Sequence, residues 1–301
     1  MLFTATLISA PAASALDETA LATARAALPA ATAPRWLDPA VAVDIAFEAA
    51  DAIDPRPLAD KIRSMLGTRP VDVVVQPAAN RRKKLLLADM DSTMINQECI
   101  DELADCVGKK AHVAAITERA MRGEIEFAPA LRERVALLAG LPGSVIDEVI
   151  AQRITLMAGA RTLVATMRRN GAHTCLVSGG FKQFTHRIAK MLGFDEDRAN
   201  TLEVSADGKL AGRVAEPILG REAKLDTLID LRGKLKLAHA DTLVVGDGAN
   251  DLAMIEDAGL GVAYHAKPKV AAAAAARIDH GDLTALLYAQ GYARAEFAPI
   301  D

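Results

Sequence analysis

Residues 84–93 read Lys-Leu-Leu-Leu-Ala-Asp-Met-Asp-Ser-Thr, an apolar run that ends in two carboxylates. A short run of this kind is typical of a buried parallel strand. Beyond residue 159, predicted strands at 173–177, 242–245 and 260–263 alternate with predicted helices. This alternation predicts an α/β domain with a doubly wound parallel sheet, whose ligands lie at the carboxyl ends of the strands.

Polar residues and glycines follow three of these strands, at the point where each strand ends. Asp89 and Asp91 close the first strand, Ser178-Gly179-Gly180 follows the second, and 246–251 (Gly-Asp-Gly-Ala-Asn-Asp) follows a later one. Carboxylates gathered at one rim raise each other's pKa unless a cation neutralises them. Mg²⁺ prefers oxygen ligands. A phosphoryl group could bind at this rim. Its oxygens would contact such a cation, Lys224 from a later helix, a serine hydroxyl and backbone N–H groups.

Residues from about 96 to 157 carry a helical pattern with no strand signal between the helices. The predicted helices span 100–107, 112–121, 128–138 and 144–152. Four short helices without a sheet indicate a helical bundle inserted into the α/β domain after its first strand. The alanine run at 271–276 also favours a helix.

The first 76 residues predict a separate module. Its strands are expected at 2–9, 35–37, 41–47 and 71–75, and its helices at 17–28 and 57–66. This βαββαβ order is the ferredoxin-like pattern. Residues 77–84 form the expected linker to the α/β domain at 85–301. We expect the basic run 81–84 to be a solvated hinge, with a contact to an anionic partner as the alternative.

Four segments together resemble, in order, the four motifs of the haloacid dehalogenase-like hydrolases. They are 89–93 (Asp-Met-Asp-Ser-Thr), Ser178-Gly179-Gly180, Lys224 and 246–251. The second Asp of the first motif marks the phosphotransferases of that superfamily. Within them the chain resembles the phosphoserine phosphatases over about residues 83–290, including a helical cap after the first motif. The resemblance implies Mg²⁺-dependent hydrolysis of O-phospho-L-serine through an aspartyl-phosphate, as the last step of serine biosynthesis.

The resemblance also implies a role for each matched residue. Asp89 would be the nucleophile, and Asp91 would protonate the leaving oxygen and then activate water. The Mg²⁺ ligands would be Asp89, the backbone carbonyl of Asp91, and Asp247, with Asp251 in a surrounding shell. The phosphoryl oxygens would contact Ser178, Gly179, Lys224 and Asn250. Substrate contacts from the cap would come from Glu98, Phe127, Arg134 and Met121.

The cap residues bear on the choice of substrate. Glu98 would meet an ammonium and Arg134 a carboxylate, while Phe127 and Met121 would exclude water. Glu98 and Arg134 together indicate that the substrate is an amino-acid phosphate. They do not distinguish hydrolysis of phosphoserine from two alternatives, which are hydrolysis of another small phosphate, such as phosphohomoserine, and transfer of the phosphoryl group to homoserine.

An alternative of a different class is a protein that senses amino acids or dimerises through its N-terminal module. That module resembles an ACT domain in element order only. Modules of this kind often pair, so we expect a homodimer.

Composition excludes several other classes of function. The 301 residues carry a net charge of −4, and only 4% are aromatic, which argues against nucleic-acid binding. Three cysteines with no metal-ligand spacing indicate buried thiols in a reducing compartment. No apolar run is long enough to cross a membrane. Arg25 is the first basic residue, so the n-region of a signal peptide is missing and we expect a cytoplasmic protein.

Overall fold

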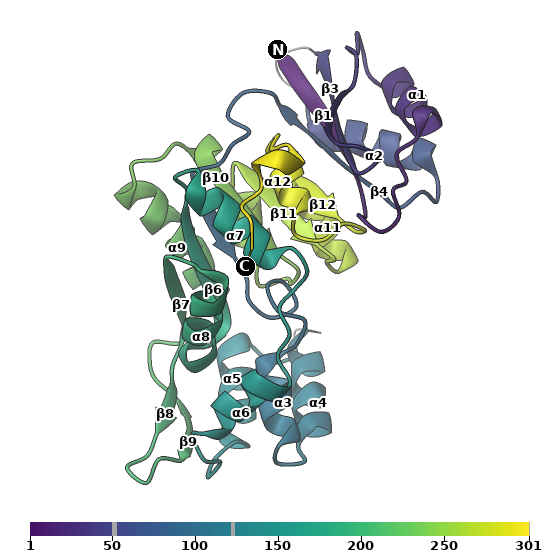
Figure 1. Ribbon diagram of the computed structural model, residues 1–301. Coiled ribbons are helices and arrows are strands. Elements are labelled where there is room, and N and C mark those ends of the chain that lie inside the picture. The colour runs from purple at the N-terminus through teal and green to yellow at the C-terminus, as the bar shows by residue number, and fades with distance from the viewer. Residues whose placement is uncertain (50–52, 122–123, 301) are drawn as a thin grey trace. The chain divides into compact units, whose positions relative to one another are not determined.

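A computed structural model describes residues 1–49, 53–121 and 124–300 (Figure 1). The chain forms two compact units. One comprises Met1–Leu87, Ala158–Thr174 and Leu228–Asp301, and the other comprises Ala88–Met157 and Cys175–Thr227. Within the described residues, no helix is both long and apolar enough to cross a membrane.

The N-terminal part of the first unit is a four-stranded antiparallel sheet with the order β2-β3-β1-β4. Its elements are β1 (Leu2–Ser9), α1 (Glu18–Ala27), β2 (Arg35–Asp38), β3 (Ala42–Glu48), α2 (Pro55–Leu66) and β4 (Val71–Pro77). Phe3, Ile45 and Val73 on one face of the sheet share a buried core with both helices. The predicted order of strands and helices agrees with these elements. At the start of α1 the Asp17 side chain accepts from the Ala20 N–H.

The opposite face of this sheet is polar, yet it is buried. Alternate residues of a strand point to opposite faces, which places Thr6, Asp44 and Asp72 on this side. Each is at most 5% exposed. The Thr6 hydroxyl donates to Asp44 at 2.8 Å. The Asp72 carboxylate accepts from three successive backbone N–H groups, those of residues 279–281, at 2.7 to 3.2 Å. This face therefore binds the C-terminal segment of the same unit.

The linker after β4 is not the solvated hinge that its basic residues predicted. The Arg81 side chain is 11% exposed. It donates to both carboxylate oxygens of Asp44, at 2.8 and 2.9 Å, and to the Ala289 carbonyl at 3.0 Å. The prediction was wrong because Asp44, the partner of Arg81, lies 37 residues earlier in the chain, where no local charge pattern reveals it.

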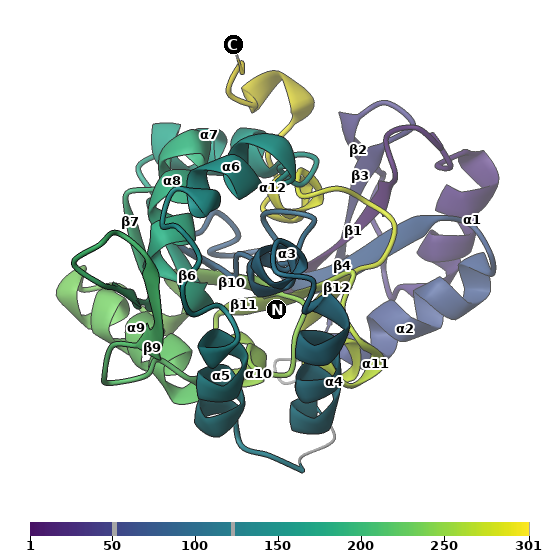
Figure 2. The same ribbon diagram turned by 90° about the horizontal axis from the view of Figure 1, so that it is seen from below.

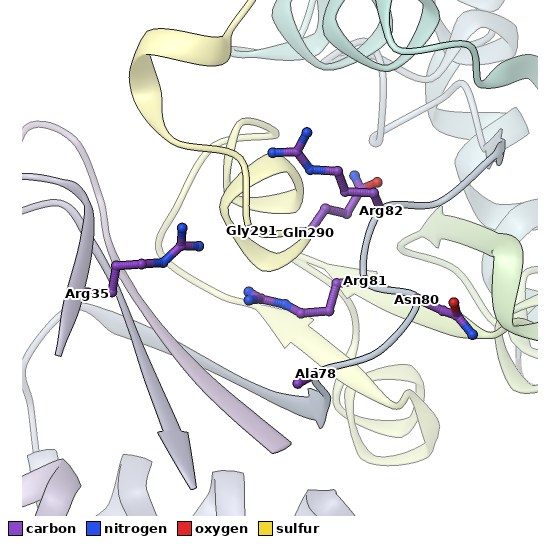
Figure 3. A pocket seen from close by; sticks show the side chains of 7 residues that line it. All are labelled: Arg35, Ala78, Asn80, Arg81, Arg82, Gln290 and Gly291. Atoms are coloured by element: carbon purple, nitrogen blue, oxygen red, sulfur yellow. The ribbon is translucent and has the colours of Figure 1, made fainter. Parts of the chain in front are cut away.

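A pocket of about 480 Å³ lies beside this linker (Figure 3). Arg35 reaches it from β2, while Arg81 and Arg82 reach it from the linker. These arginines already have carboxylate partners. Arg35 pairs with Asp44 at 3.0 Å, and Arg82 pairs with Glu296 at 2.6 Å. The positive charge of the pocket is therefore largely neutralised within the protein.

Lys83, in the same linker, makes stability depend on pH. Its side chain donates to the Ala240 carbonyl at 2.8 Å and is almost fully covered. Burial lowers the pKa of Lys83 to about 8, against a smaller opposing effect of Asp241. Between about pH 8 and the roughly 10.4 of a free lysine, the unfolded chain binds a proton that the folded chain has released. The free energy of unfolding therefore rises with pH in this window, by up to about 3 kcal/mol.

Urea unfolding between pH 7.5 and 10 tests this linkage. We expect Lys83→Met to remove most of the rise that the unmodified chain shows. Lys84→Met replaces the neighbouring exposed lysine and should keep the rise. If the free energy of unfolding rises equally with pH in Lys83→Met and in the unmodified chain, burial of Lys83 is not the cause of the rise.

The larger sheet has the strand order β12-β11-β10-β5-β6-β7. Its strands are β5 (Leu85–Ala88), β6 (His173–Phe181), β7 (Glu196–Asn200), β10 (Thr242–Gly246), β11 (Leu260–Tyr264) and β12 (Ala276–Ile278). The pairs β6–β7, β10–β11 and β11–β12 are parallel. The accompanying helices are α7 (Ala160–Arg169), α8 (Lys182–Leu192), α9 (Arg221–Lys234), α10 (Leu252–Glu256), α11 (Pro268–Ala273) and α12 (Ala285–Ala289). The predicted α/β fold with a parallel sheet is confirmed.

The second unit contains the helical segment that follows β5. Its helices are α3 (Cys99–Asp105), α4 (Lys110–Met121), α5 (Phe127–Ala136) and α6 (Val145–Gln152), of which α4 and α5 lie side by side (Figure 2). The two connections to this segment pair with each other, since the Asn96 N–H donates to Thr155 and the Met157 N–H donates to Met94. The loop between α5 and α6 pairs with the hairpin formed by β8 (Leu202–Val204) and β9 (Leu210–Val214).

Two strands of the larger sheet were not predicted. β7 reads Glu-Asp-Arg-Ala-Asn and β12 reads Ala-Arg-Ile. Both lie at edges of the sheet, where side chains are less completely buried and the apolar pattern is weak. The alanine run was also extended too far as a helix, because α11 ends at Ala273 and Ala276 begins β12.

Candidate active site

Asp89 lies directly after β5 and forms a buried ion pair with Lys224 of α9. The Asp89 Oδ1 atom is 2.7 Å from the Lys224 Nζ, and the two side chains are 7% and 3% exposed. The same oxygen accepts from the Met90 N–H at 2.8 Å. A buried pair of this kind is costly to break, because the remaining charge would be uncompensated. The pair therefore fixes the Asp89 carboxylate in one orientation.

Asp91 and Glu98 lie on the turn that follows. The Asp91 carboxylate accepts from the Cys99 N–H at 3.3 Å. Burial raises the pKa of Asp91 well above its usual range, and the Glu98 and Asp89 carboxylates add to the effect. Ser92 has a φ of 55°, in the left-handed region, and its hydroxyl donates to Glu98 Oε1 at 2.7 Å. This hydrogen bond holds the Glu98 side chain over the first motif.

Ser178 and the two glycines after it lie in the last part of β6 and not after the strand, at an irregularity in its pairing with β7 between Val177 and Phe181; we call this irregular segment the Ser178 turn. Ser178 is 3% exposed, and its Oγ accepts from the Gly180 N–H at 2.9 Å. A β-carbon at Gly180 would lie 3.2 Å from Asp91 Oδ2. Asp91 therefore lies against this turn, and glycine at 180 allows that close approach.

Two of the predicted cap residues lie close to these groups. A β-carbon at Gly179 would lie 3.2 Å from the Phe127 ring, so the ring covers the turn. Arg134 donates to the Thr117 hydroxyl and to the Ala130 carbonyl, both at 3.2 Å.

Burial lowers the pKa of Arg134, and the Asp101, Glu98 and Asp91 carboxylates oppose this shift. Arg134 is therefore a partly buried cation in an acidic environment. The Met121 side chain, also predicted to contact substrate, lies outside the described part of the structure.

The segment 246–251 turns tightly from β10 into α10. The Gly248 N–H donates to Asp251 Oδ2 at 3.0 Å, and Asp251 is fully buried. A β-carbon at Gly246 would lie 2.5 Å from the Asp251 carboxyl, so glycine is required there. Asp247 is half-buried, and its carbonyl accepts from the Lys267 N–H at 3.4 Å. Asn250 is half-buried on the same turn.

Three of the predicted carboxylates are candidate ligands for a cation. Asp247 and Asp251 both lie on the segment between β10 and α10 in the first unit, and Asp89 follows β5 in the second unit. Carboxylate oxygens are the ligands that hard divalent cations such as Mg²⁺ prefer. The donor set therefore fits such a cation.

No role was predicted for Ser92, although it belongs to the first motif, nor for Thr117 or Asn200. Each holds a predicted site residue through a hydrogen bond, to Glu98, Arg134 and Gly179 respectively. The partners lie 6, 17 and 21 positions apart in the chain. No spacing rule for a helix or strand connects residues at those separations, so one sequence carries no signal that would find them.

The chain is similar to known enzymes over much of its length. The profile of the haloacid dehalogenase-like hydrolases matches residues 86–256. A phosphoserine phosphatase of Polaromonas sp. is 48% identical over 209 residues, which cover 68% of this chain and 88% of that protein. A phosphoserine phosphatase of Mycobacterium tuberculosis is 42% identical over 247 residues, or 81% of this chain, and this chain spans 60% of its length.

The chain is also similar to a solved phosphoserine phosphatase structure. It is a phospho-aspartyl intermediate analogue of phosphoserine phosphatase, 40% identical to this chain with a TM-score of 0.64. The match covers 98% of that protein and 68% of this chain.

Proposed function

The chain belongs to the haloacid dehalogenase-like hydrolases, among their phosphatases, and we propose that it hydrolyses O-phospho-L-serine to L-serine and phosphate. The observation that carries the proposal is the buried Asp89–Lys224 pair, with Asp91 held against the Ser178 turn. It supplies a fixed carboxylate nucleophile, a cation and a second carboxyl group, which phosphoryl transfer through a covalent intermediate needs.

The proposed reaction has two steps at phosphorus. Asp89 attacks with Oδ2, since Oδ1 is held by Lys224 and by the Met90 N–H. The bond from phosphorus to the serine oxygen breaks, and Asp91 gives that oxygen its proton. Asp91 then takes a proton from water, whose oxygen attacks the aspartyl-phosphate and releases phosphate and Asp89. We assign Ser178, Gly179, Lys224 and Asn250 to the phosphoryl oxygens.

A divalent cation is part of this proposal. Asp89, Asp247 and the Asp91 carbonyl would hold Mg²⁺, and Asp251, which is buried and accepts from the Gly248 N–H on the turn that carries Asp247, would lie in the shell around these ligands. A bound Mg²⁺ supplies positive charge to the phosphoryl oxygens.

Removing the cation should stop turnover. We expect EDTA to lower phosphate release by about 100-fold or more and added Mg²⁺ to restore it, since charge neutralisation is a large part of phosphoryl-transfer catalysis. Mg²⁺ should also raise the melting temperature, because it binds only the folded chain. Asp247→Asn should lose this thermal shift. Asp257→Asn changes an acidic residue that pairs with Arg232 instead and should keep it. Full activity in EDTA would refute the metal site.

The proposed substrate contacts come from Glu98 and Arg134. Glu98 would meet the ammonium of phosphoserine, and Ser92 already orients it. Arg134 would pair with the carboxylate, and Phe127 would cover the phosphoryl group at Gly179.

A substrate panel tests this assignment. The full chain with Mg²⁺ should release phosphate from phosphoserine far faster than from p-nitrophenyl phosphate. Glu98→Gln keeps the oxygen that accepts from Ser92 but loses the charge. It should lower kcat/KM for phosphoserine by about 10-fold to 100-fold and leave p-nitrophenyl phosphate nearly unchanged.

Glu133→Gln removes an exposed carboxylate from α5 and serves as the control. Equal rates on the two substrates would exclude phosphoserine as the preferred substrate. Phosphate transfer to added homoserine would favour a transferase instead.

We also propose that the N-terminal module is ferredoxin-like and of the ACT kind. Its sheet order β2-β3-β1-β4 and its two helices on one face support this proposal. A homodimer formed through this module remains a prediction, and the molar mass in solution would test it.

A further inference from the structure

Asn200, the last residue of β7, joins two loops of the second unit. It is 2% exposed. Its side-chain NH₂ donates to the Gly179 carbonyl at 2.9 Å and to the Leu219 carbonyl at 3.0 Å. Its Oδ1 accepts from the Leu219 N–H at 2.7 Å. Both hydrogens and the oxygen of the amide are therefore used on backbone groups, which fixes its orientation.

The hydrogen bond to Gly179 determines how the Ser178 turn presents its donors. In a trans peptide the C=O and the following N–H point in opposite directions. Asn200 holds the Gly179 carbonyl on one side, so the Gly180 N–H points to the other side. That N–H donates to Ser178 Oγ at 2.9 Å. The hydroxyl oxygen is thereby occupied as an acceptor, and its own proton is left to donate to a ligand.

The hydrogen bonds to Leu219 extend the effect to the loop before α9. Gly220 follows Leu219, and α9, which carries Lys224, begins at Arg221. A β-carbon at Gly220 would lie 3.5 Å from the Phe127 ring, the same ring that covers Gly179. Asn200 thus connects the serine turn to the segment that leads to the buried lysine.

We infer that Asn200 is a positioning residue for phosphoryl binding, which it serves by orienting the Gly179–Gly180 peptide and through it the Ser178 hydroxyl. The inference rests on the proposed phosphatase function. It concerns the way in which the phosphoryl site is held, and Asn200 itself touches neither substrate nor metal.

Gln183 of α8 provides a matched control. Its side chain makes the same kind of clamp, donating to the Leu202 carbonyl at 2.8 Å and accepting from the Leu202 N–H at 3.2 Å. Gln183→Ala therefore removes hydrogen bonds of the same type from the neighbouring segment and leaves the Ser178 turn in place. A merely structural role for Asn200 would make the two alanine variants behave alike.

The experiment compares Asn200→Ala, Asn200→Asp and Gln183→Ala in the full chain. We expect both Asn200 variants to weaken inhibition by inorganic phosphate about 10-fold and to lower kcat by about 10-fold to 100-fold. Gln183→Ala should leave the phosphate inhibition constant and kcat within about twofold of those of the unmodified chain. Its melting temperature should be similar to those of the Asn200 variants. Asn200→Asp keeps the acceptor for Leu219, so it provides a folded variant if the alanine variant unfolds.

An unchanged phosphate inhibition constant in a folded Asn200 variant would overturn the inference, as would equal losses in Gln183→Ala. If the unmodified chain does not hydrolyse phosphoserine, the proposed function fails separately. Calorimetric binding of inorganic phosphate then tests Asn200 directly. A 10-fold weaker affinity in the variants would support the positioning role, and equal or absent binding throughout would refute it.

Discussion

Phosphate release from phosphoserine is expected to fall by about 10⁴-fold or more when Asp89 is replaced by asparagine. The substitution keeps the size of the side chain but replaces a carboxylate oxygen with a nitrogen that is a poor nucleophile. Uncatalysed hydrolysis of phosphate monoesters is among the slowest reactions known. A residual route through direct attack of water would therefore be slow, even with the rest of the site intact.

Acid quenching separates loss of the nucleophile from general damage. The unmodified chain, mixed with ³²P-phosphoserine and quenched, should carry an acid-stable, hydroxylamine-labile label that Asp89→Asn lacks. The variant leaves Lys224 buried without its carboxylate, which itself destabilises the fold. The double variant Asp89→Asn with Lys224→Met removes that charge and should remain unlabelled. More than a few per cent of the original activity in folded Asp89→Asn would disprove the role of Asp89.

The second large effect concerns the stability of the first unit. We expect Asp72→Ala to lower the free energy of unfolding by about 3 kcal/mol, because three successive N–H groups at 279–281, of which that of Gly281 is buried, would lose their acceptor. Asp72→Asn keeps one acceptor oxygen and should cost less.

Urea unfolding followed by circular dichroism measures both variants. Glu256→Ala removes an exposed carboxylate of α10 and should change stability by less than about 0.5 kcal/mol. A loss below 1 kcal/mol in Asp72→Ala would mean that water replaces the carboxylate at little cost.

Local signals carried most of the prediction of the fold. The apolar run that became β5 and the helical patterns that became α3 to α6 each depend on a few adjacent residues. The positions at strand ends similarly indicated Asp89 and Ser178 as candidates. Backbone geometry of this kind is encoded nearby in the chain, so one sequence is enough to find it.

Long-range partners could not be predicted in the same way. β7 lacks an apolar pattern because it lies at an edge, and Arg81 was assigned to solvent because Asp44 is distant in sequence. Asn200 has ordinary polar character in the sequence, and its importance follows only from the two carbonyls that it meets. Such contacts depend on the tertiary fold and not on local spacing.

The buried polar face of the N-terminal sheet affects how the activity of a truncated chain should be interpreted. The match to the phosphoserine phosphatase structure covers 98% of that protein and 68% of this chain. In this protein Asp72 accepts from the N–H groups of residues 279–281, and Gln76 donates to the Ala289 carbonyl. Deleting the first 80 residues would remove both side chains and expose these backbone groups to water. A loss of activity on truncation would then measure damage to the C-terminal segment, and point substitutions inside the module are the better way to look for a regulatory signal.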